Sequence, residues 1–328
     1  MLEITNQDAL YWSRLGMRKA YGDVISRIAQ TDPDIVCIAA DVADSANLGV
    51  FRDKCPRRYF NVGISEQNMI GVACGLAKEG YNVFVTSFAP FVSLRAYEAI
   101  RTLVCYMNLN VKIVALSSGF SLGVQGATHY ALEDIAIMRA IPGLAVLSPA
   151  DTTQMAKMLE YLADYDGAAY LRLTGIPGSP CVYKEGFAYN PETFDVVKDG
   201  GKDAVIFATG AMVNEAVRAS RLLAKERIGT TVVNVSRLDA IDKEEIKAMC
   251  AGCRLVVTVE EHYITGGLGS MVSECIAERS VHPRVVRIGT AGFNLICGNY
   301  AYMLEANGLT AKRIAERIRM EYAKEGYD

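Results

Sequence analysis

The sequence predicts an α/β fold with two doubly wound domains, because three of its features point the same way. Continuous apolar runs such as 35–40 and 111–116 are typical of parallel strands that are buried on both faces. Segments with apolar residues at helical spacing separate these runs, which favours strand–helix–strand units. A stretch rich in Gly and Pro, 175–201, lacks the periodicity of a helix or a strand and divides the pattern into two parts.

The first part of the chain begins with a helix or arm at 1–16 and then alternates helices with strands. The predicted strands are 35–40, 83–87, 111–116, 144–147 and 168–173. The predicted helices are 17–30, the segment from Glu66 to Gly80, the segment from Arg95 to Val104, 133–140 and 151–162. Polar residues follow several of these strands directly, which is where open α/β sheets bind ligands.

The second part repeats this alternation from Asp203 onward. Its predicted strands are 204–208, 230–234, 255–259 and 285–288, and its predicted helices lie at about 212–225, 242–250, 267–279 and 310–323. We therefore expect one domain at 1–190, with the linker starting at about 175, and a second domain at 191–328.

Composition excludes several classes of function. The chain has 328 residues, of which 51% are hydrophobic and 22% are charged, and its net charge is −3. This balance favours neither nucleic acid nor an anionic membrane as a partner. No apolar run reaches the length of a membrane span, and the N-terminus does not have the pattern of a signal peptide. We expect a cytoplasmic protein.

Nine cysteines lie mostly inside apolar runs, as in a protein with reduced, buried thiols. One Cys-x-x-Cys pair, Cys250 and Cys253, falls where a predicted helix ends before a strand. No second pair stands near it, so a helix-to-strand turn is favoured over a redox or zinc site.

The helix that starts at Glu66 has an unusual composition. Ser65 before it is a good N-cap, and Gly80 is a good C-terminal signal. A carboxylate in a first helical turn often does no more than complement the helix dipole. Here the helix is apolar, and Gly71 and Gly75 let one side approach a neighbour closely. That pattern favours a buried cleft at Glu66.

Residues 61–91, NVGISEQNMIGVACGLAKEGYNVFVTSFAPF, resemble the pyrimidine-binding domain of transketolases. The resemblance extends from Met17 to about Arg317, and residues 257–274, VTVEEHYITGGLGSMVSE, resemble the transketolase C-terminal domain. The chain is thus similar to the C-terminal half of a transketolase that is split over two genes. The resemblance implies an enzyme that uses thiamine diphosphate to transfer a two-carbon ketol unit from a ketose phosphate to an aldose phosphate.

The resemblance implies four cofactor residues. Glu66 matches the catalytic Glu that hydrogen-bonds N1′ of the aminopyrimidine ring. Phe88 matches a residue that packs against this ring, and Phe91 lies beside it. Asp41 matches an Asp near the cofactor.

The resemblance also implies a set of substrate residues. His129, within GVQGATHYALED, matches a catalytic His that contacts the sugar phosphate or the substrate hydroxyls. Arg18, Ser45 and Arg172 match positions that bind the acceptor phosphate. Guanidinium groups suit that role, because they can hold phosphate through two parallel hydrogen bonds.

The chain departs from the family at two positions near the substrate. Gln125 stands where the family usually has an Asp that contacts the hydroxyl next to the reacting carbonyl carbon. Gln125 can still bind a substrate hydroxyl, but it carries no charge. Ser117 stands where many family members have a His. These departures leave the identity of the sugar open.

The chain lacks the motif that holds the cofactor's diphosphate. Thiamine enzymes bind the diphosphate and Mg²⁺, or Ca²⁺, through Gly-Asp-Gly and a later Asn, whose oxygen ligands suit a hard cation. Gly22-Asp23-Val24 does not match this motif, so we expect no metal ligand in this chain. An N-terminal transketolase subunit would hold the metal. We expect two copies of each subunit, an α₂β₂ assembly in which this chain also contacts its own copy.

Several alternatives remain open from the sequence. A related thiamine diphosphate enzyme is one of them: a transketolase for an unusual sugar phosphate, an enzyme like deoxyxylulose-phosphate synthase, or a 2-oxoacid dehydrogenase β subunit. A non-catalytic partner subunit is another. The joint presence of Glu66, Phe88, His129 and Arg172 argues against a non-catalytic role.

Overall fold

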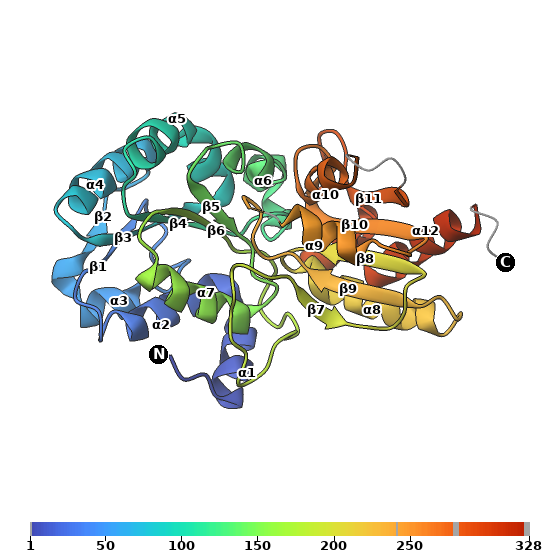
Figure 1. Ribbon diagram of the computed structural model, residues 1–328. Coiled ribbons are helices and arrows are strands. Elements are labelled where there is room, and N and C mark those ends of the chain that lie inside the picture. Colours follow the sequence, from blue (N-terminus) through green and yellow to red (C-terminus); the bar gives the residue numbers. More distant parts are fainter. Residues whose placement is uncertain (1, 241, 278–281, 325–328) are drawn as a thin grey trace.

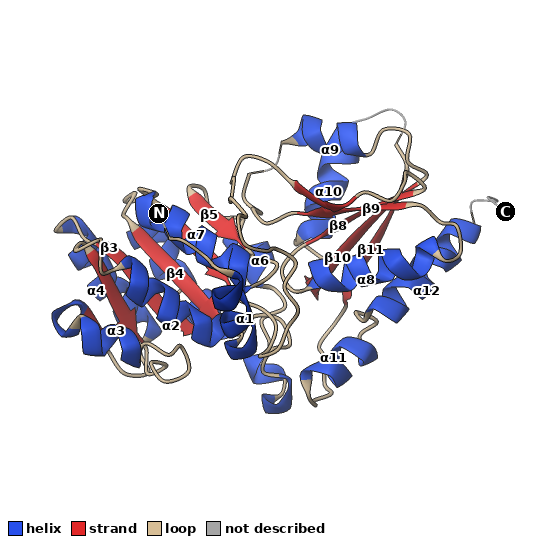
Figure 2. Cartoon of the chain, turned by 90° about the horizontal axis from the view of Figure 1, so that it is seen from below, coloured by secondary structure: helices blue, strands red, loops and turns tan. Residues whose placement is uncertain are grey.

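The computed structural model describes residues 2–240, 242–277 and 282–324. Two β-sheets, one from each predicted part of the chain, lie side by side and carry helices on their faces (Figures 1 and 2). The prediction of two α/β domains is confirmed. The boundary at 190 stays a prediction.

The first sheet has six strands in the order β2-β1-β3-β4-β6-β5, and every pair in it is parallel. Its strands are β1 (Ile35–Ala39), β2 (Tyr59–Asn61), β3 (Asn82–Phe88), β4 (Val111–Leu116), β5 (Leu144–Leu147) and β6 (Ala168–Arg172). Its helices are α1 (Asn6–Leu15), α2 (Met17–Ile28), α3 (Gly49–Lys54), α4 (Glu66–Lys78), α5 (Tyr97–Ala99), α6 (Asp134–Met138) and α7 (Thr152–Asp164).

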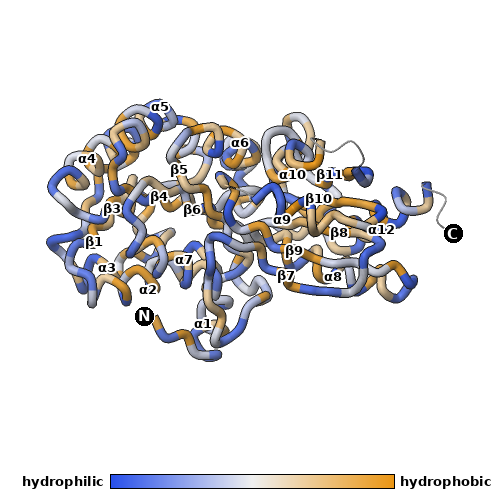
Figure 3. The backbone as a smooth tube through the Cα atoms, in the orientation of Figure 1, coloured by the Kyte–Doolittle hydropathy of each residue, from blue (hydrophilic) through white to orange (hydrophobic). Residues whose placement is uncertain are grey.

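Helices cover both faces of this sheet, which explains the continuous apolar runs of its strands. Helices α4, α5 and α6 pack on one face, and α1, α2, α3 and α7 pack on the other. Along β1, Ile38 faces the first group of helices and Cys37 faces the second. Apolar residues accordingly concentrate in the strands of both sheets (Figure 3).

The second sheet is mixed, with the order β11-β10-β8-β9-β7. Only β7 runs antiparallel to its neighbour. Its strands are β7 (Asp195–Lys198), β8 (Ala204–Ala208), β9 (Thr230–Asn234), β10 (Leu255–Tyr263) and β11 (Arg284–Thr290). The helices are α8 (Met212–Ala224), α9 (Lys243–Met249), α10 (Leu268–Ala277), α11 (Tyr300–Ala306) and α12 (Ala311–Ala323).

The sequence-based prediction missed several features of the fold, among them the short strand β2 and the short helix α3. Strand β7 lies inside the predicted linker, and helix α11 was not predicted. The predicted helix from Arg95 to Val104 is broken, with wide π-type turns on either side of the short α5. Strand β7 is short, lies at a sheet edge and leaves Val196 49% exposed, so it lacks the apolar run of an interior strand.

The structure tests two local predictions, the helix cap at Ser65 and the turn at Cys250–Cys253. Ser65 does occupy the N-cap of α4, but its hydroxyl makes no capping hydrogen bond. Its ψ of 73° differs from the 163° of Thr5, whose side chain does cap α1. The Cys250–Cys253 pair lies between the end of α9 and the start of β10, so the predicted helix-to-strand turn is confirmed.

The two domains share an apolar core and backbone hydrogen bonds. A single cluster of buried side chains runs from the face of α4 and α6 to α9 and α10 of the second domain. The backbone N–H of Leu238 donates to Val146 O at 2.8 Å, and that of Tyr263 donates to Leu132 O at 2.7 Å. These contacts fix how the second domain sits against the first.

Candidate active site

Three of the predicted site residues, Phe88, Arg172 and Asp41, lie with Ser117 at one edge of the first sheet. Phe88 and Arg172 end β3 and β6, Ser117 follows β4 directly, and Asp41 lies just past β1. Strands β1, β3, β4 and β6 are consecutive neighbours and all parallel, so their carboxyl ends lie side by side. This edge is where open α/β sheets bind ligands.

Glu66 begins α4 and is buried, with 4% of its surface exposed. Its carboxylate accepts from Ser87 Oγ at 3.4 Å and from Arg95 Nη1 at 3.4 Å. Both contacts are long for hydrogen bonds, so the carboxylate keeps lone pairs for a further donor. A buried carboxylate with this spare capacity is unusual, because buried polar groups are normally fully paired.

Aromatic rings line the space beside Glu66. Phe88 and Phe91 meet edge to face with their centroids 6.1 Å apart, and the His129 ring lies 5.3 Å from Phe91. The Arg95 guanidinium lies 4.1 Å above the Phe91 ring. The structure thus brings Glu66, Phe88, Phe91 and His129 into one group. The sequence-based prediction did not include Arg95, which joins Phe91 to Glu66.

The remaining substrate candidates lie on loops and on α2. Arg18, in the first turn of α2, donates from Nη1 to Ser117 Oγ at 3.4 Å, and burial lowers the pKa of its guanidinium. Asp41 is exposed and left-handed, with a φ of 58°, and Ser45 is half-buried nearby in sequence. Gln125 is exposed in the loop that carries His129.

Arg172 does not lie where a phosphate could reach it, and this prediction needs correction. Its side chain is fully buried, and its Nε donates to Asp134 Oδ2 at 2.8 Å. Its Nη2 donates to the carbonyl oxygens of Glu261 at 2.8 Å and of Ala131 at 3.3 Å. The guanidinium thus faces into the junction between the two domains. Arg172 stabilises that junction and is not a substrate ligand in this structure.

Replacing Asp134 with Ala is expected to destabilise the chain by about 3–5 kcal/mol, because it leaves the buried Arg172 charge without its counter-ion. Asp134 also accepts from Tyr170 Oη at 3.0 Å, which Tyr170→Phe removes without leaving a charge unpaired. Tyr170→Phe serves as the control and should cost about 1 kcal/mol. Urea unfolding followed by circular dichroism measures both variants; equal losses would contradict this role of the ion pair.

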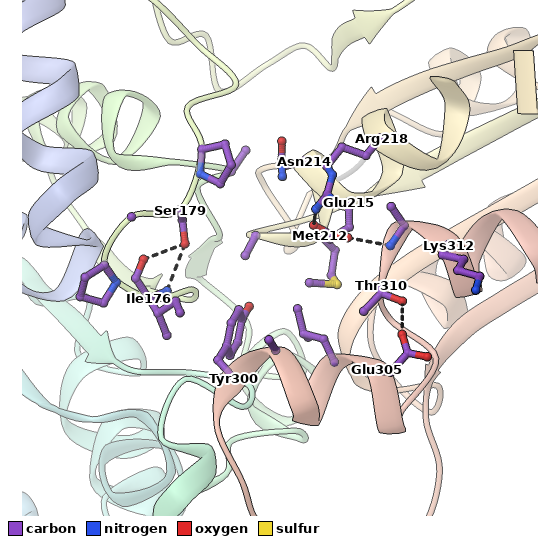
Figure 4. Close-up of a pocket in the computed structure, with 18 residues that line it drawn as sticks. Ile176, Ser179, Met212, Asn214, Glu215, Arg218, Tyr300, Glu305, Thr310 and Lys312 are labelled. Carbon is purple, nitrogen blue, oxygen red and sulfur yellow. Dashed lines mark hydrogen bonds and ion pairs between the residues drawn. The ribbon is translucent and has the colours of Figure 1, made fainter. Parts of the chain in front are cut away.

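A pocket of about 400 Å³ lies elsewhere, between the segment 176–180 and helices α8, α11 and α12 (Figure 4). Its lining is largely apolar, with an ion pair between Arg218 and Glu215 at 2.6 Å on its wall. None of the predicted site residues lines it.

Among the described residues, no group of three or more His, Cys, Asp or Glu side chains could hold a metal ion. Within the described part of the chain, no helix is long and apolar enough to cross a membrane.

The fold and this sheet edge define a two-domain α/β protein with a candidate ligand site that contains aromatic rings. Comparison with known proteins gives its family. Residues 13–175 match the transketolase pyrimidine-binding domain, and residues 193–314 match the transketolase C-terminal domain. The chain belongs to the transketolase family. The resemblance inferred from the sequence is confirmed.

Relatives similar over nearly the whole chain include separate transketolase subunits. A transketolase C-terminal section from Methanocaldococcus jannaschii is 40% identical over 94% of this chain and 97% of its own length. One subunit of an apulose-4-phosphate transketolase from Actinobacillus succinogenes is 36% identical over 86% and 91%. A solved split-gene transketolase, an inactive β4 tetramer, is 36% identical, covers 94% of this chain and 98% of that chain, and has a TM-score of 0.84.

Proposed function

We propose that this chain is the pyrimidine-binding subunit of a two-chain transketolase of cytoplasmic pentose phosphate and carbohydrate metabolism. It would transfer a two-carbon ketol unit from a ketose phosphate to an aldose phosphate. The observation that carries the proposal is the buried Glu66 carboxylate, with spare hydrogen-bonding capacity, beside the Phe88 and Phe91 rings. Similarity to separate transketolase subunits supports it.

The residues present fit the pyrimidine end of thiamine diphosphate. When bound, the cofactor supplies a nucleophilic ring carbon that can accept and pass on the ketol unit. Glu66 would hold a proton against N1′ of the aminopyrimidine, and a buried carboxylate suits this role. Phe88 and Phe91 would pack on the ring and keep water from Glu66, and Asp41 would lie near the cofactor.

Substrate binding falls to residues around the same edge. With Arg172 enclosed, Arg18 is the cation that we propose for the sugar phosphate, with Ser45 as a hydroxyl donor. His129 would bind the substrate hydroxyls from the loop beside Phe91 and would act as the second catalytic residue. Gln125, exposed on the same loop, would contact the hydroxyl next to the reacting carbon.

The diphosphate end of the cofactor needs a partner subunit. An N-terminal transketolase chain would hold the diphosphate with Mg²⁺ or Ca²⁺, whose preferred ligands are oxygens. Gly71 and Gly75 are exposed on α4, and a Cβ at either would meet nothing within 4 Å beyond its chain neighbours and the backbone of its own helix. That smooth helix side is available to a second copy of the chain. We propose an α₂β₂ assembly in which α4 lies at the two-fold contact.

A second candidate is a transketolase that acts on an unusual sugar phosphate. The relative from Actinobacillus succinogenes carries the name of an apulose-4-phosphate transketolase subunit. Gln125, which is exposed in the loop that carries His129, is the residue of this chain that favours such a specificity. An uncharged amide there would bind a different pattern of hydroxyls from a carboxylate.

The experiment that tests the proposed function is reconstitution. This chain is co-expressed with a partner that carries the Gly-Asp-Gly motif, purified as a complex and assayed with a panel of ketose phosphates and aldose phosphates. We expect ketol transfer with at least one donor and acceptor pair, dependent on thiamine diphosphate and Mg²⁺. The partner assayed alone is the control. A stable complex that binds the cofactor but transfers no ketol unit from any donor would contradict the proposal.

A further inference from the structure

The loop formed by residues 117–129 leaves the first sheet after β4 but is anchored on the second domain. This segment, called here the substrate loop, carries Ser117, Gln125 and His129. Phe120 within it and Tyr130 just after it pack edge to face, with centroids 5.2 Å apart. Both rings belong to the apolar core of the second domain, together with side chains of β8, α8 and α12.

Polar contacts reinforce this anchoring. The single proton of Tyr130 Oη is within hydrogen-bonding distance of two carbonyl oxygens, those of Ile296 at 2.8 Å and Gly123 at 3.0 Å. The backbone N–H of Gly298 donates to Gly123 O at 3.1 Å. The substrate loop is therefore held by the segment that leads into α11, which is far away in the sequence.

Glu261 makes the most direct of these contacts. It lies on β10 and is buried, and its Oε1 accepts from the backbone N–H of Phe120. Its Oε2 accepts from Tyr300 Oη at 2.8 Å, at the start of α11. One carboxylate of the second domain thus joins the base of the substrate loop to α11. Losing it would leave the buried N–H of Phe120 without a partner.

The Glu261 carboxylate packs directly against the backbone of the substrate loop at Gly119. A Cβ placed on Gly119 would lie 2.4 Å from the Glu261 carboxyl carbon, so only a glycine allows the approach. Gly119 also has a φ of 65°, in the left-handed region. Backbone hydrogen bonds from Gly119 N to Ala131 O at 3.0 Å and from Ala131 N to Gly119 O at 3.3 Å close the base of the loop. The Glu261 contact therefore acts on a loop that is already closed at its base.

The neighbouring residue on β10 shows what a purely structural carboxylate looks like here. Glu260 is also fully buried, but its oxygens accept from the backbone N–H groups of Leu268 at 2.7 Å and Gly269 at 2.8 Å. Both partners belong to α10 of the same domain. These contacts attach the Glu260 carboxylate to its own domain, whereas the Glu261 carboxylate contacts the substrate loop at the domain junction.

We propose that Glu261 is a positioning residue: through the backbone N–H of Phe120 it holds the substrate loop, and thus Gln125 and His129, in the arrangement that binds the sugar phosphate. The role of the loop in substrate binding rests on the proposed function. The contact itself does not. The second domain thereby contributes to substrate binding without touching the substrate.

Charged and titratable groups from three other elements face the Glu261 carboxylate. They are Arg172 from β6, Asp134 from α6 and Tyr300 from α11. Burial raises the pKa of Glu261 to about 7, against the opposing effects of the Phe120 amide and Arg172. A neutral amide of the same shape can still accept from the Phe120 N–H and can donate to Tyr300. Glu261→Gln should therefore preserve the contact, whereas Glu261→Ala removes it.

Hydrogen exchange of the isolated chain tests the contact independently of activity. In Glu261→Ala, amides of residues 118–131 should exchange roughly 10-fold or more faster, as expected for a lost buried hydrogen bond. Exchange in β4 should stay unchanged. Glu261→Gln should restore most of the protection, and the matched control Glu260→Ala should leave the loop as in the wild type. Equal effects of Glu260→Ala and Glu261→Ala on the loop, or none from Glu261→Ala, would overturn the proposal.

Two glycine substitutions test the same contact if Glu261→Ala does not fold. Gly119→Ala places a Cβ against the Glu261 carboxylate, while Gly126→Ala in the same loop has a φ of 81° but no atom within 4 Å of the new Cβ. Both variants carry the strain of a left-handed residue, so only the difference between them reports the contact. We expect faster loop exchange in Gly119→Ala alone. Equal exchange in the two variants would count against Glu261.

Kinetics of the reconstituted two-chain enzyme then test the link to substrate. For Glu261→Ala we expect the KM for the ketose phosphate to rise about 10-fold or more, with the dissociation constant of thiamine diphosphate unchanged. Glu261→Gln should return KM close to the wild-type value. An unchanged KM would refute the positioning role. If the wild-type pair shows no transfer at all, the proposed function fails, while the exchange result still decides whether Glu261 holds the loop.

Discussion

Glu66→Gln is expected to leave the chain folded and to lower the turnover of the assembled enzyme by about 10²–10⁴-fold. Glutamine has nearly the same shape as glutamate, but its amide cannot share a proton with N1′ of the cofactor. The long contacts of Glu66 to Ser87 and Arg95, both at 3.4 Å, contribute little to folding. Arg95 is also half exposed, and ion pairs with an exposed partner are weak.

The measurement is kcat at saturating thiamine diphosphate and sugar phosphates, with thermal unfolding as the check on folding. Glu79→Gln is the matched control, because Glu79 lies at the other end of the same helix and is exposed. It should retain wild-type turnover. A Glu66→Gln enzyme that turns over like the control would remove Glu66 from the catalytic role.

Much of the fold could be predicted because buried parallel strands leave a clear pattern in the sequence. The predicted strands 111–116 and 144–147 coincide with β4 and β5, where every residue is buried. Strand β7 could not be found in this way, since an edge strand pairs on one side only and needs no apolar run. The break around α5 was missed because Tyr97, Ile100 and Val104 recur at the three- and four-residue spacing of an unbroken helix.

The candidate site was predictable only where local sequence decides the position of a side chain. Glu66, Phe88 and Phe91 lie within one short stretch, and the structure brings them together as the resemblance implied. An arginine that ends a strand has the same sequence pattern whether it faces a ligand or a neighbouring domain. Arg172 faces the neighbouring domain, because its guanidinium binds Asp134 and the carbonyl oxygen of Glu261. These partners lie 38 and 89 residues away in the sequence, so no local pattern indicates them.

The contact of Glu261 with the substrate loop could not be predicted from the sequence either. Its partner Phe120 lies 141 residues away in the sequence, so no motif around Glu261 reveals the contact. Arg95 was likewise missed, although it lies only four residues after Phe91. Its contact with Glu66 depends on the π-type turn that carries it and spans 29 residues of sequence. Contacts of this kind become visible only when the domains and turns are placed in space.

The second large effect concerns assembly, because this chain is proposed to hold only the pyrimidine half of the cofactor site. Glu66, Phe88 and Phe91 would offer partners to the ring, whereas Gly22-Asp23-Val24 does not match the Gly-Asp-Gly motif that the family uses for the diphosphate and its metal. The anionic diphosphate needs a cation and backbone donors, which a ring pocket cannot replace. The isolated chain should therefore turn over no substrate at any concentration of cofactor and Mg²⁺.

Isothermal titration of thiamine diphosphate with Mg²⁺ is the most direct test of this half-site. One cell holds the isolated chain, and the other holds the complex of this chain with a partner that carries the Gly-Asp-Gly motif. We predict weak binding or none to the isolated chain and tight, Mg²⁺-dependent binding to the complex, weakened when Glu66→Gln replaces the wild-type chain. Tight, Mg²⁺-dependent binding to the isolated chain would contradict the account.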